Sequence, residues 1–210
     1  NVSFCLKRGH VHALIGPNGA GKSTMINMLT GIVPPDAGTI KFSGQSVVGK
    51  PAHAICVLGM GRTFQNLRLF GELSVLDNVM LGAEPGWRLT PARAQVRQQL
   101  QALMQSTGLQ VRLDALVQDL PVGERQRLEI LKALYRGARI LILDEPTAVL
   151  TPQETEQLFA TLRGLRERGT TILLITHKLK EIMALCDAVT VMRAGQVVLD
   201  TPIADTSLDG

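Results

Sequence analysis

The sequence predicts an α/β protein with a mainly parallel sheet, and three features of its 210 residues carry that prediction. Short, wholly apolar runs alternate with longer helical stretches, as in parallel sheets that helices cover on both faces. A glycine-rich segment stands between the first such run and the first helix. The last two apolar runs flank Ala194-Gly195, which is typical of a hairpin and adds a small antiparallel part.

The first part of the chain predicts a strand, a glycine-rich loop and a helix. We expect the strand over residues 11–15, an apolar run followed by glycine. The helix should occupy residues 22–30 and stop at Gly31. A turn rich in Pro and Gly at 34–38 should then lead into a strand over 39–42.

Helical signals dominate the middle of the chain. Ser74 is a typical N-cap for a helix over residues 75–81, and Thr90-Pro91 opens a long helix rich in Gln and Arg. We therefore expect one domain over residues 1–210. Its core is formed by residues 1–65 and 137–210, and residues 66–136 form an inserted α-helical lobe.

Strands and helices alternate again in the last third of the chain. The apolar runs at 140–143 and 171–176 predict two buried strands, and the segment between them predicts a helix from Pro152 to near Gly169. The closing hairpin pairs residues 189–192 with 196–199.

Composition excludes several classes of protein. Apolar residues make up 45% and charged residues 19%, which argues against disorder. No apolar run approaches the roughly 20 residues that span a bilayer. Aromatic residues are 3% and the net charge is only +4, so we expect no nucleic acid as a partner. The three cysteines are widely spaced and indicate reduced thiols in a cytoplasmic protein.

A phosphate-binding loop follows the first strand. The segment Gly16-Pro17-Asn18-Gly19-Ala20-Gly21-Lys22-Ser23 fits the P-loop pattern G-x-x-x-x-G-K-S/T, between a predicted strand and a predicted helix. Its glycines let backbone N–H groups surround a phosphate, while Lys22 reaches the β- and γ-phosphates and the Ser23 hydroxyl binds Mg²⁺. We expect a P-loop NTPase whose nucleotide is bound by these eight residues and by Thr24.

Two carboxylates end the strand at 140–143. Asp144 and Glu145 stand at the carboxyl end of a buried parallel strand, the edge where ligands of open α/β sheets gather. Asp144 is placed to orient Mg²⁺ through water, and Glu145 to act as the general base on an attacking water.

Taken together, five segments resemble the nucleotide-binding subunit of ABC (ATP-binding cassette) transporters, over nearly the whole chain. They are the P-loop, Thr63-Phe64-Gln65, Leu120-Pro121-Val122-Gly123-Glu124-Arg125-Gln126-Arg127, Asp144-Glu145 and Thr176-His177. The resemblance implies an ATPase that uses Mg²⁺ and powers solute import. It implies a peripheral place at the cytoplasmic face of the plasma membrane.

The resemblance also implies a role for each segment. Gln65 would contact Mg²⁺ and the attacking water, and His177 would bind the γ-phosphate and hold Glu145 in place. Residues 120–124 would form the signature loop, Leu120, Pro121, Val122, Gly123 and Glu124, which closes over ATP on the opposite subunit. The expected partners are therefore a second ABC subunit, identical or not, integral-membrane permease subunits and, indirectly, a solute-binding protein.

This sequence departs from the common family pattern at the signature and after the acidic pair. Pro121, Val122 and Glu124 replace the usual Ser, Gly and Gln, and Thr151 stands where an Asp is common. These variants leave open a module that binds ATP but hydrolyses it poorly. A soluble ABC-type ATPase acting on ribosomes or DNA is the other alternative.

The substrate signals in the sequence conflict. The segment 62–70 resembles importers of branched-chain amino acids, whereas 127–139 and 176–182 resemble importers of sugars and nucleosides. Because 66–79 is where permease subunits usually dock, the amino-acid reading is slightly favoured. Only 15 residues precede Gly16, so we expect a trimmed module whose adenine-stacking residue lies outside it.

Overall fold

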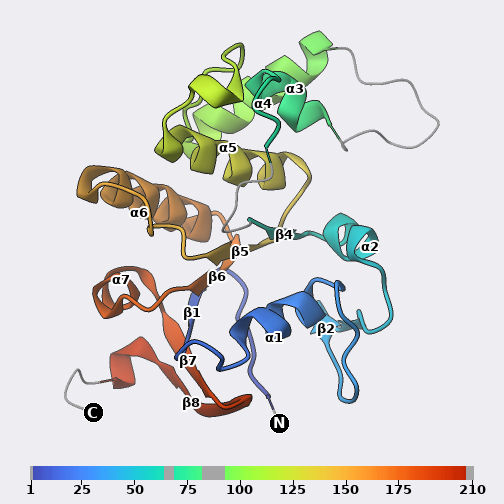
Figure 1. Ribbon diagram of the computed structural model, residues 1–210, viewed down its shortest axis with the longest axis vertical. Helices are drawn as coiled ribbons and strands as arrows, with labels where there is room; N and C mark the ends of the chain where they lie inside the picture. Colours follow the sequence, from blue (N-terminus) through green and yellow to red (C-terminus); the bar gives the residue numbers. More distant parts are fainter. Residues whose placement is uncertain (1, 64–68, 82–92, 207–210) are drawn as a thin grey trace.

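The computed structural model describes residues 2–63, 69–81 and 93–206, and its centre is a six-stranded sheet (Figure 1). The strands are β1 (Val11–Ile15), β4 (Met60–Arg62), β5 (Ile140–Asp144), β6 (Thr171–Ile175), β7 (Ala188–Arg193) and β8 (Gln196–Pro202). Their order across the sheet is β4-β5-β6-β1-β7-β8, and only the β7–β8 pair is antiparallel. The predicted α/β class with a mainly parallel sheet is confirmed, and so is the closing hairpin.

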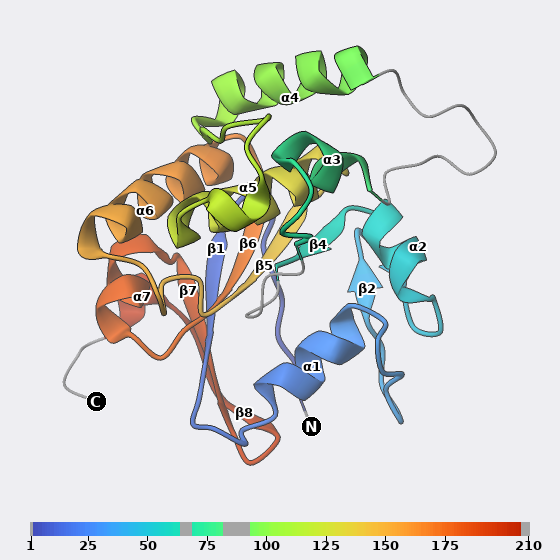
Figure 2. The same ribbon diagram turned by 45° about the horizontal axis from the view of Figure 1, so that its top comes forward.

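Helices lie on both sides of this sheet (Figures 1 and 2). They are α1 (Lys22–Leu29), α2 (Ala52–Val57), α3 (Val75–Met80), α4 (Arg93–Thr107), α5 (Val122–Tyr135), α6 (Pro152–Glu167) and α7 (Leu179–Leu185), with short 3-10 helices at Val117–Asp119 and Ile203–Asp205. In Figure 1, α3, α4 and α5 gather at one end, away from the β7–β8 hairpin. Within the described residues, no helix has both the length and the apolar character needed to cross a membrane.

The strand predicted over residues 39–42 is shorter in the structure. It is β2 (Lys41–Phe42), which pairs with β3 (Gln45–Ser46) in a separate two-stranded antiparallel sheet. The helix α2 and the edge strand β4 were not predicted. Each is short, and β4 has Gly61 and Arg62 where a strand signal needs apolar or β-branched residues.

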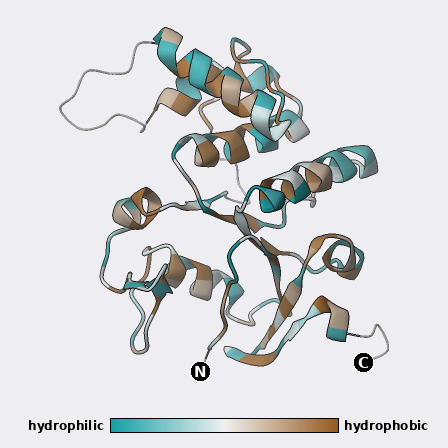
Figure 3. Ribbon diagram, turned by 180° about the vertical axis from the view of Figure 1, so that it is seen from behind, coloured by the Kyte–Doolittle hydropathy of each residue, from teal (hydrophilic) through white to brown (hydrophobic). Residues whose placement is uncertain are grey.

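Alternate residues of the central strands enter two separate apolar clusters. In β5, Leu141 and Leu143 pack toward α5 and α6, whereas Ile142 packs on the opposite face with Ile26 of α1. Successive side chains of a strand point to opposite faces, so both faces of this strand are buried and it reads as one continuous apolar run. Figure 3 shows brown, hydrophobic segments along the central strands and alternating brown and teal patches on the helices around them.

Among the described residues, side-chain caps hold the starts of α3 and α6. The Ser74 hydroxyl accepts a hydrogen bond from the Asp77 N–H at the start of α3, as predicted. Thr151 and Glu154 form a reciprocal capping box at the start of α6, where Pro152 is the first helical residue. Such a cap contributes roughly 1 kcal/mol to stability.

A buried histidine lies on the central strand β1. His12 is 4% exposed, and its Nε2 lies 2.6 Å from Thr190 Oγ1, which in turn donates to Asp200 Oδ1 at 2.7 Å. Burial lowers the pKa of His12, an effect that the Asp200 charge opposes and His10 supports. The imidazole is therefore neutral in the fold, and its Nε2–H donates to Thr190.

This histidine predicts a loss of stability on mild acidification. The unfolded chain takes up a proton near pH 6.5, which the folded state resists, so the free energy of unfolding falls as pH drops below that value. The slope reaches at most about 1.4 kcal/mol per pH unit. Urea denaturation between about pH 7.5 and about pH 5.5 should show this fall in the free energy of unfolding for the wild type. The fall should be smaller for His12→Gln. The exposed His53→Gln control should keep the wild-type slope, and an equal slope in His12→Gln would contradict the assignment.

Candidate functional site

The loop between β1 and α1 needs glycine where its backbone meets β7. Gly16 has φ +151°, and a Cβ there would lie 2.2 Å from the Met192 carbonyl oxygen, closer than any side chain permits. Gly21 caps α1 in the left-handed conformation, and no side chain occupies the N-cap. No side chain of the N-cap accepts from the first N–H groups of α1, and a helix N-terminus of this kind favours an anion.

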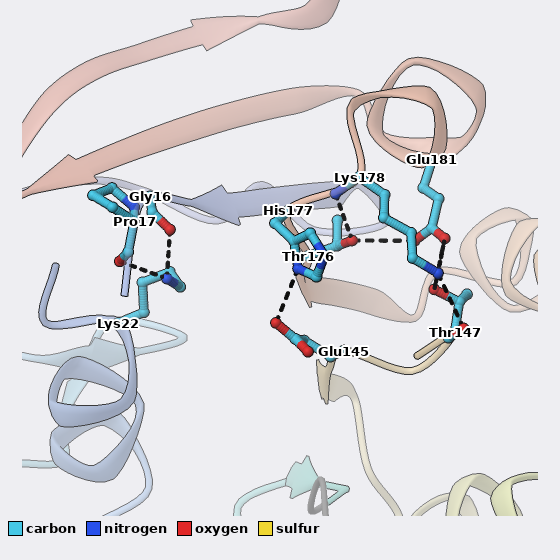
Figure 4. A network of polar contacts seen from close by, with 9 residues as sticks. All are labelled: Gly16, Pro17, Lys22, Glu145, Thr147, Thr176, His177, Lys178 and Glu181. Carbon is cyan, nitrogen blue, oxygen red and sulfur yellow. Dashed lines mark hydrogen bonds and ion pairs between the residues drawn. The ribbon is translucent and has the colours of Figure 1, made fainter. Parts of the chain in front are cut away.

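The lysine of the loop folds back over it. Lys22 Nζ donates to the carbonyl oxygens of Gly16, at 2.6 Å, and of Pro17, at 3.1 Å (Figure 4). In the structure the carbonyls of Gly16 and Pro17 therefore hold this ammonium. The predicted part of these two residues in nucleotide binding stays a prediction.

The acidic pair lies beside this loop because the strands are parallel. Asp144 at the end of β5 pairs in register with Ile175 of β6, and β6 pairs with β1. One cavity of 280 Å³ is lined by Asn18, Gly19, Ala20, Gly21, Lys22, Ser23, Thr24, Asp144, Glu145 and Ile175. Its volume is at the low end for a ligand site, which suits part of a ligand such as a phosphate chain.

Asp144 sits in a mixed electrostatic environment. Burial raises its pKa, the Arg62 guanidinium lowers it, the neighbouring Glu145 raises it again and Lys22 lowers it. Arg62 Nη2 lies 3.8 Å from Asp144 Oδ2, while its Nη1 donates to Asn27 Oδ1 at 2.7 Å. No local signal in the sequence assigns Arg62 to this site, because β4, which carries it, is a short strand with few apolar residues.

Glu145 is held in an unusual backbone conformation next to His177. It has φ +46°, in the left-handed region that few residues other than glycine adopt, and its N–H donates to the Ile175 carbonyl at 2.8 Å. Its Oε1 lies 3.1 Å from His177 Nδ1 (Figure 4). The predicted pair is thus brought together, with side chains 29% and 68% exposed.

The predicted signature segment lies apart from this cavity. None of residues 120–124 lines it. Leu120 is buried, Pro121 is the N-cap of α5, and Val122 is 41% exposed. A Cβ on Gly123 would lie 2.5 Å from Glu154 Oε1 of α6, and Glu124 forms an ion pair with Arg112 at 3.3 Å. Gln65, predicted to contact Mg²⁺, lies outside the described residues.

The donors around the cavity fit a phosphate chain together with a divalent cation. The ammonium of Lys22 and the helix N-terminus attract phosphate oxygens. The Ser23 hydroxyl and the Asp144 carboxylate, which line the same cavity, are oxygen ligands of the kind that Mg²⁺ prefers.

Comparison with known proteins agrees with this geometry. The family model described as "ABC transporter" matches residues 1–148. The "Ribose import ATP-binding protein RbsA 2" of Burkholderia ambifaria is 44% identical over the whole chain, which covers 42% of that protein. The "Nucleoside import ATP-binding protein NupA" of Lactococcus lactis is 42% identical over 97% of the chain, covering 40% of that protein. The chain thus spans less than half the length of these relatives.

Solved structures share the fold. A nucleotide-free ATP-binding cassette from an ABC transporter superposes with a TM-score of 0.85 and 28% identity, over 96% of this chain and 83% of that one. The cbiO1 protein of Clostridium perfringens, part of the transporter complex cbiONQ, gives a TM-score of 0.84 and 31% identity, over 96% and 80%. By its family match, its identity to these relatives and its fold, the chain belongs to the ABC transporter family, as an ATP-binding cassette of that family.

Proposed function

We propose that this chain binds ATP with Mg²⁺ and hydrolyses it to power the import of a small solute. The observation that carries the proposal is the single cavity that joins residues 18–24 to Asp144 and Glu145. A phosphate-binding loop and two carboxylates meet there, so binding groups and a general base lie side by side. Family membership supports the same reaction.

Each group around the cavity has a distinct task in this proposal. Lys22 leaves its two loop carbonyls to bind the β- and γ-phosphates, and Ser23, Gln65 and Asp144 are the residues that would hold Mg²⁺. When bound, Mg²⁺ neutralises charge on the phosphate oxygens. Burial is the largest influence on Asp144 and leaves its pKa raised, whereas the Arg62 guanidinium acts in the opposite direction and favours the ionised form.

Glu145 and His177 act on the attacking water. The Glu145 carboxylate takes a proton from the water, which then attacks the γ-phosphorus in line with the leaving oxygen. His177 lies 3.1 Å from that carboxylate and orients it, and it also forms a hydrogen bond with the γ-phosphate. Positioning and charge stabilisation supply most of the rate in reactions of this type.

The remote signature segment supports a two-subunit assembly. Residues 120–124 do not line the cavity of their own chain, and α5 begins without a side-chain cap. We infer that this segment, with the exposed Val122, closes over ATP held by a second ABC subunit. We also infer that residues 66–136 form an inserted helical lobe, since α3, α4 and α5 gather at one end of the molecule (Figure 1), with α5 packed in the same apolar cluster as β5.

The relatives favour a sugar or a nucleoside as the imported solute. Their names specify import of ribose and of nucleosides, at 44% and 42% identity. The slight preference of the sequence analysis for a branched-chain amino acid finds no support in these comparisons. We therefore propose a sugar or nucleoside importer, whose permease holds this cassette at the cytoplasmic face and which receives solute from a binding protein.

Removing the Lys22 ammonium should weaken nucleotide binding. Hydrogen bonds to charged groups contribute about 1.5–3 kcal/mol, so Lys22→Ala should raise the dissociation constant for ATP by at least about tenfold. Titration with a fluorescent ATP analogue measures it. The exposed Lys50→Ala variant is the matched control and should bind as the wild type does. Equal affinity in both variants would contradict the assignment.

Replacing the general base should separate binding from hydrolysis. Glu145→Gln should lower kcat by about 10²–10⁴-fold, because a general base contributes that much. It should still bind ATP and hold it in a closed dimer, visible as a shift to the dimer in size-exclusion chromatography. Glu156→Gln, an exposed carboxylate on α6, should hydrolyse ATP normally. Turnover in Glu145→Gln that equals the wild-type rate would defeat the proposal.

The solute class can be tested in the full-length protein with its permease. We expect binding protein loaded with ribose or a nucleoside to stimulate ATP hydrolysis in vesicles, and leucine-loaded protein to leave it unchanged. Stimulation by leucine alone would restore the amino-acid reading.

A further inference from the structure

A buried carboxylate next to the candidate site joins three segments of the chain. Glu181, in the first turn of α7, is 7% exposed. It accepts hydrogen bonds from Thr147 Oγ1 at 2.6 Å and from Thr176 Oγ1 at 3.1 Å (Figure 4). Lys178 Nζ lies 3.2 Å from its Oε1. The loop after β5, the end of β6 and the start of α7 therefore converge on one side chain.

Both threonine hydroxyls in this network donate and accept. Thr147 Oγ1 accepts from Lys178 Nζ at 3.1 Å, and Thr176 Oγ1 accepts from the Lys178 N–H at 3.1 Å. A hydroxyl has one proton, and here that proton is directed at Glu181. An acceptor-only group at position 181 thus orients both hydroxyls and leaves their lone pairs for Lys178.

The network is close in sequence to Glu145 and His177. Thr147 is two residues after Glu145, and Thr176 immediately precedes His177. The Glu145 N–H also donates to the Ile175 carbonyl at 2.8 Å, so a second hydrogen bond joins the loop after β5 to the end of β6. A shift of Thr147 relative to Thr176 would move the two segments that carry Glu145 and His177, whose Oε1 and Nδ1 atoms lie 3.1 Å apart.

The backbone of Glu145 also needs support from its surroundings. Its φ of +46° is a costly conformation for a residue other than glycine, and it persists only where neighbouring contacts enforce it. Thr147, 2% exposed and bonded to both Glu181 and Lys178, supplies such a contact on the loop that leaves Glu145.

We propose that Glu181 is a positioning residue for ATP hydrolysis, acting through Thr147 and Thr176 on the geometry of Glu145 and His177. The proposal rests on the proposed function, because it assigns these two side chains to the attack on the γ-phosphate. A displacement of about 1 Å at reacting groups can cost about 10²-fold in rate. The network controls a displacement of that size without touching the nucleotide cavity, whose lining includes none of its four residues.

The first test separates positioning from a merely structural role. Glu181→Gln keeps the size of the side chain but replaces one of the two acceptor oxygens with a donor NH2 group. One of the two threonine hydroxyls then loses its acceptor and must reorient. We expect kcat of the full-length protein to fall about tenfold, while the KM for ATP and the dissociation constant stay within about twofold. Glu167→Gln, an exposed carboxylate at the end of α6, is the matched control.

A second pair of variants tests the network even if Glu181→Gln does not fold. Thr147→Val removes the hydroxyl at nearly constant volume and should lower kcat as Glu181→Gln does. Thr147→Ser retains the hydroxyl and should keep most of the wild-type kcat. Equal rates in the Val and Ser variants would overturn the proposal, because the hydroxyl would then have no part in the geometry.

A double-mutant cycle shows whether Glu181 acts through the reactive pair. In a His177→Ala background, Glu181→Gln should cost much less than in the wild type, since residues that share one function are not additive. Full additivity would overturn the proposal. So would a fall in kcat that is matched by equal losses in ATP affinity and melting temperature, which is the signature of a damaged fold.

The outcomes also separate this proposal from the proposed function. Wild-type protein that hydrolyses ATP no faster than Glu145→Gln defeats the proposed function itself. Wild-type turnover that stops in Glu145→Gln but is unchanged in Glu181→Gln leaves the proposed function intact and overturns the positioning role alone.

Discussion

The parallel pairing of β1, β5 and β6 determines where the phosphate loop lies relative to Asp144 and Glu145. Leu14 of β1 and Asp144 of β5 both pair with Ile175 of β6, so the carboxyl ends of three strands reach one edge of the sheet. Two apolar clusters hold this register, one on each face. A slip of one residue would turn each strand's side chains to the opposite face, and the phosphate loop would no longer face the acidic pair.

Charge at that edge is balanced between neighbours that come from distant parts of the sequence. Lys22 and Arg62 both favour the ionised form of Asp144, whereas burial and Glu145 oppose it. Arg62 also bonds Asn27 of α1, so one guanidinium links the helix that follows the loop to the strand that carries the carboxylates. A ligand that brings phosphates and a cation enters an edge where opposite charges are already close together.

The sequence predicts those parts of the molecule whose cause is local. The apolar runs of β5 and β6, the Ser74 cap and the glycine-rich loop each depend on residues close together in the chain, and all are found as predicted. The strand β4 has no such signal. Gly61 is there because a Cβ would lie 2.9 Å from the Ala138 Cβ, a contact that only the fold creates. Roles that depend on tertiary neighbours, such as that of Glu181, 34 residues from Thr147, leave no local trace.

Thr151 shows how a departure from a motif acquires meaning in the structure. In the sequence it replaces an Asp common in the family, whereas in the fold its hydroxyl and N–H complete the capping box of α6 with Glu154. The loop that leaves Glu145 is therefore held at both ends, by Glu181 at Thr147 and by this cap at Thr151. Between these anchors Val149 is 70% exposed. Hydrogen bonds on both sides of Val149 therefore fix this loop relative to Glu145, so Thr151 keeps the loop in place although it departs from the common family pattern.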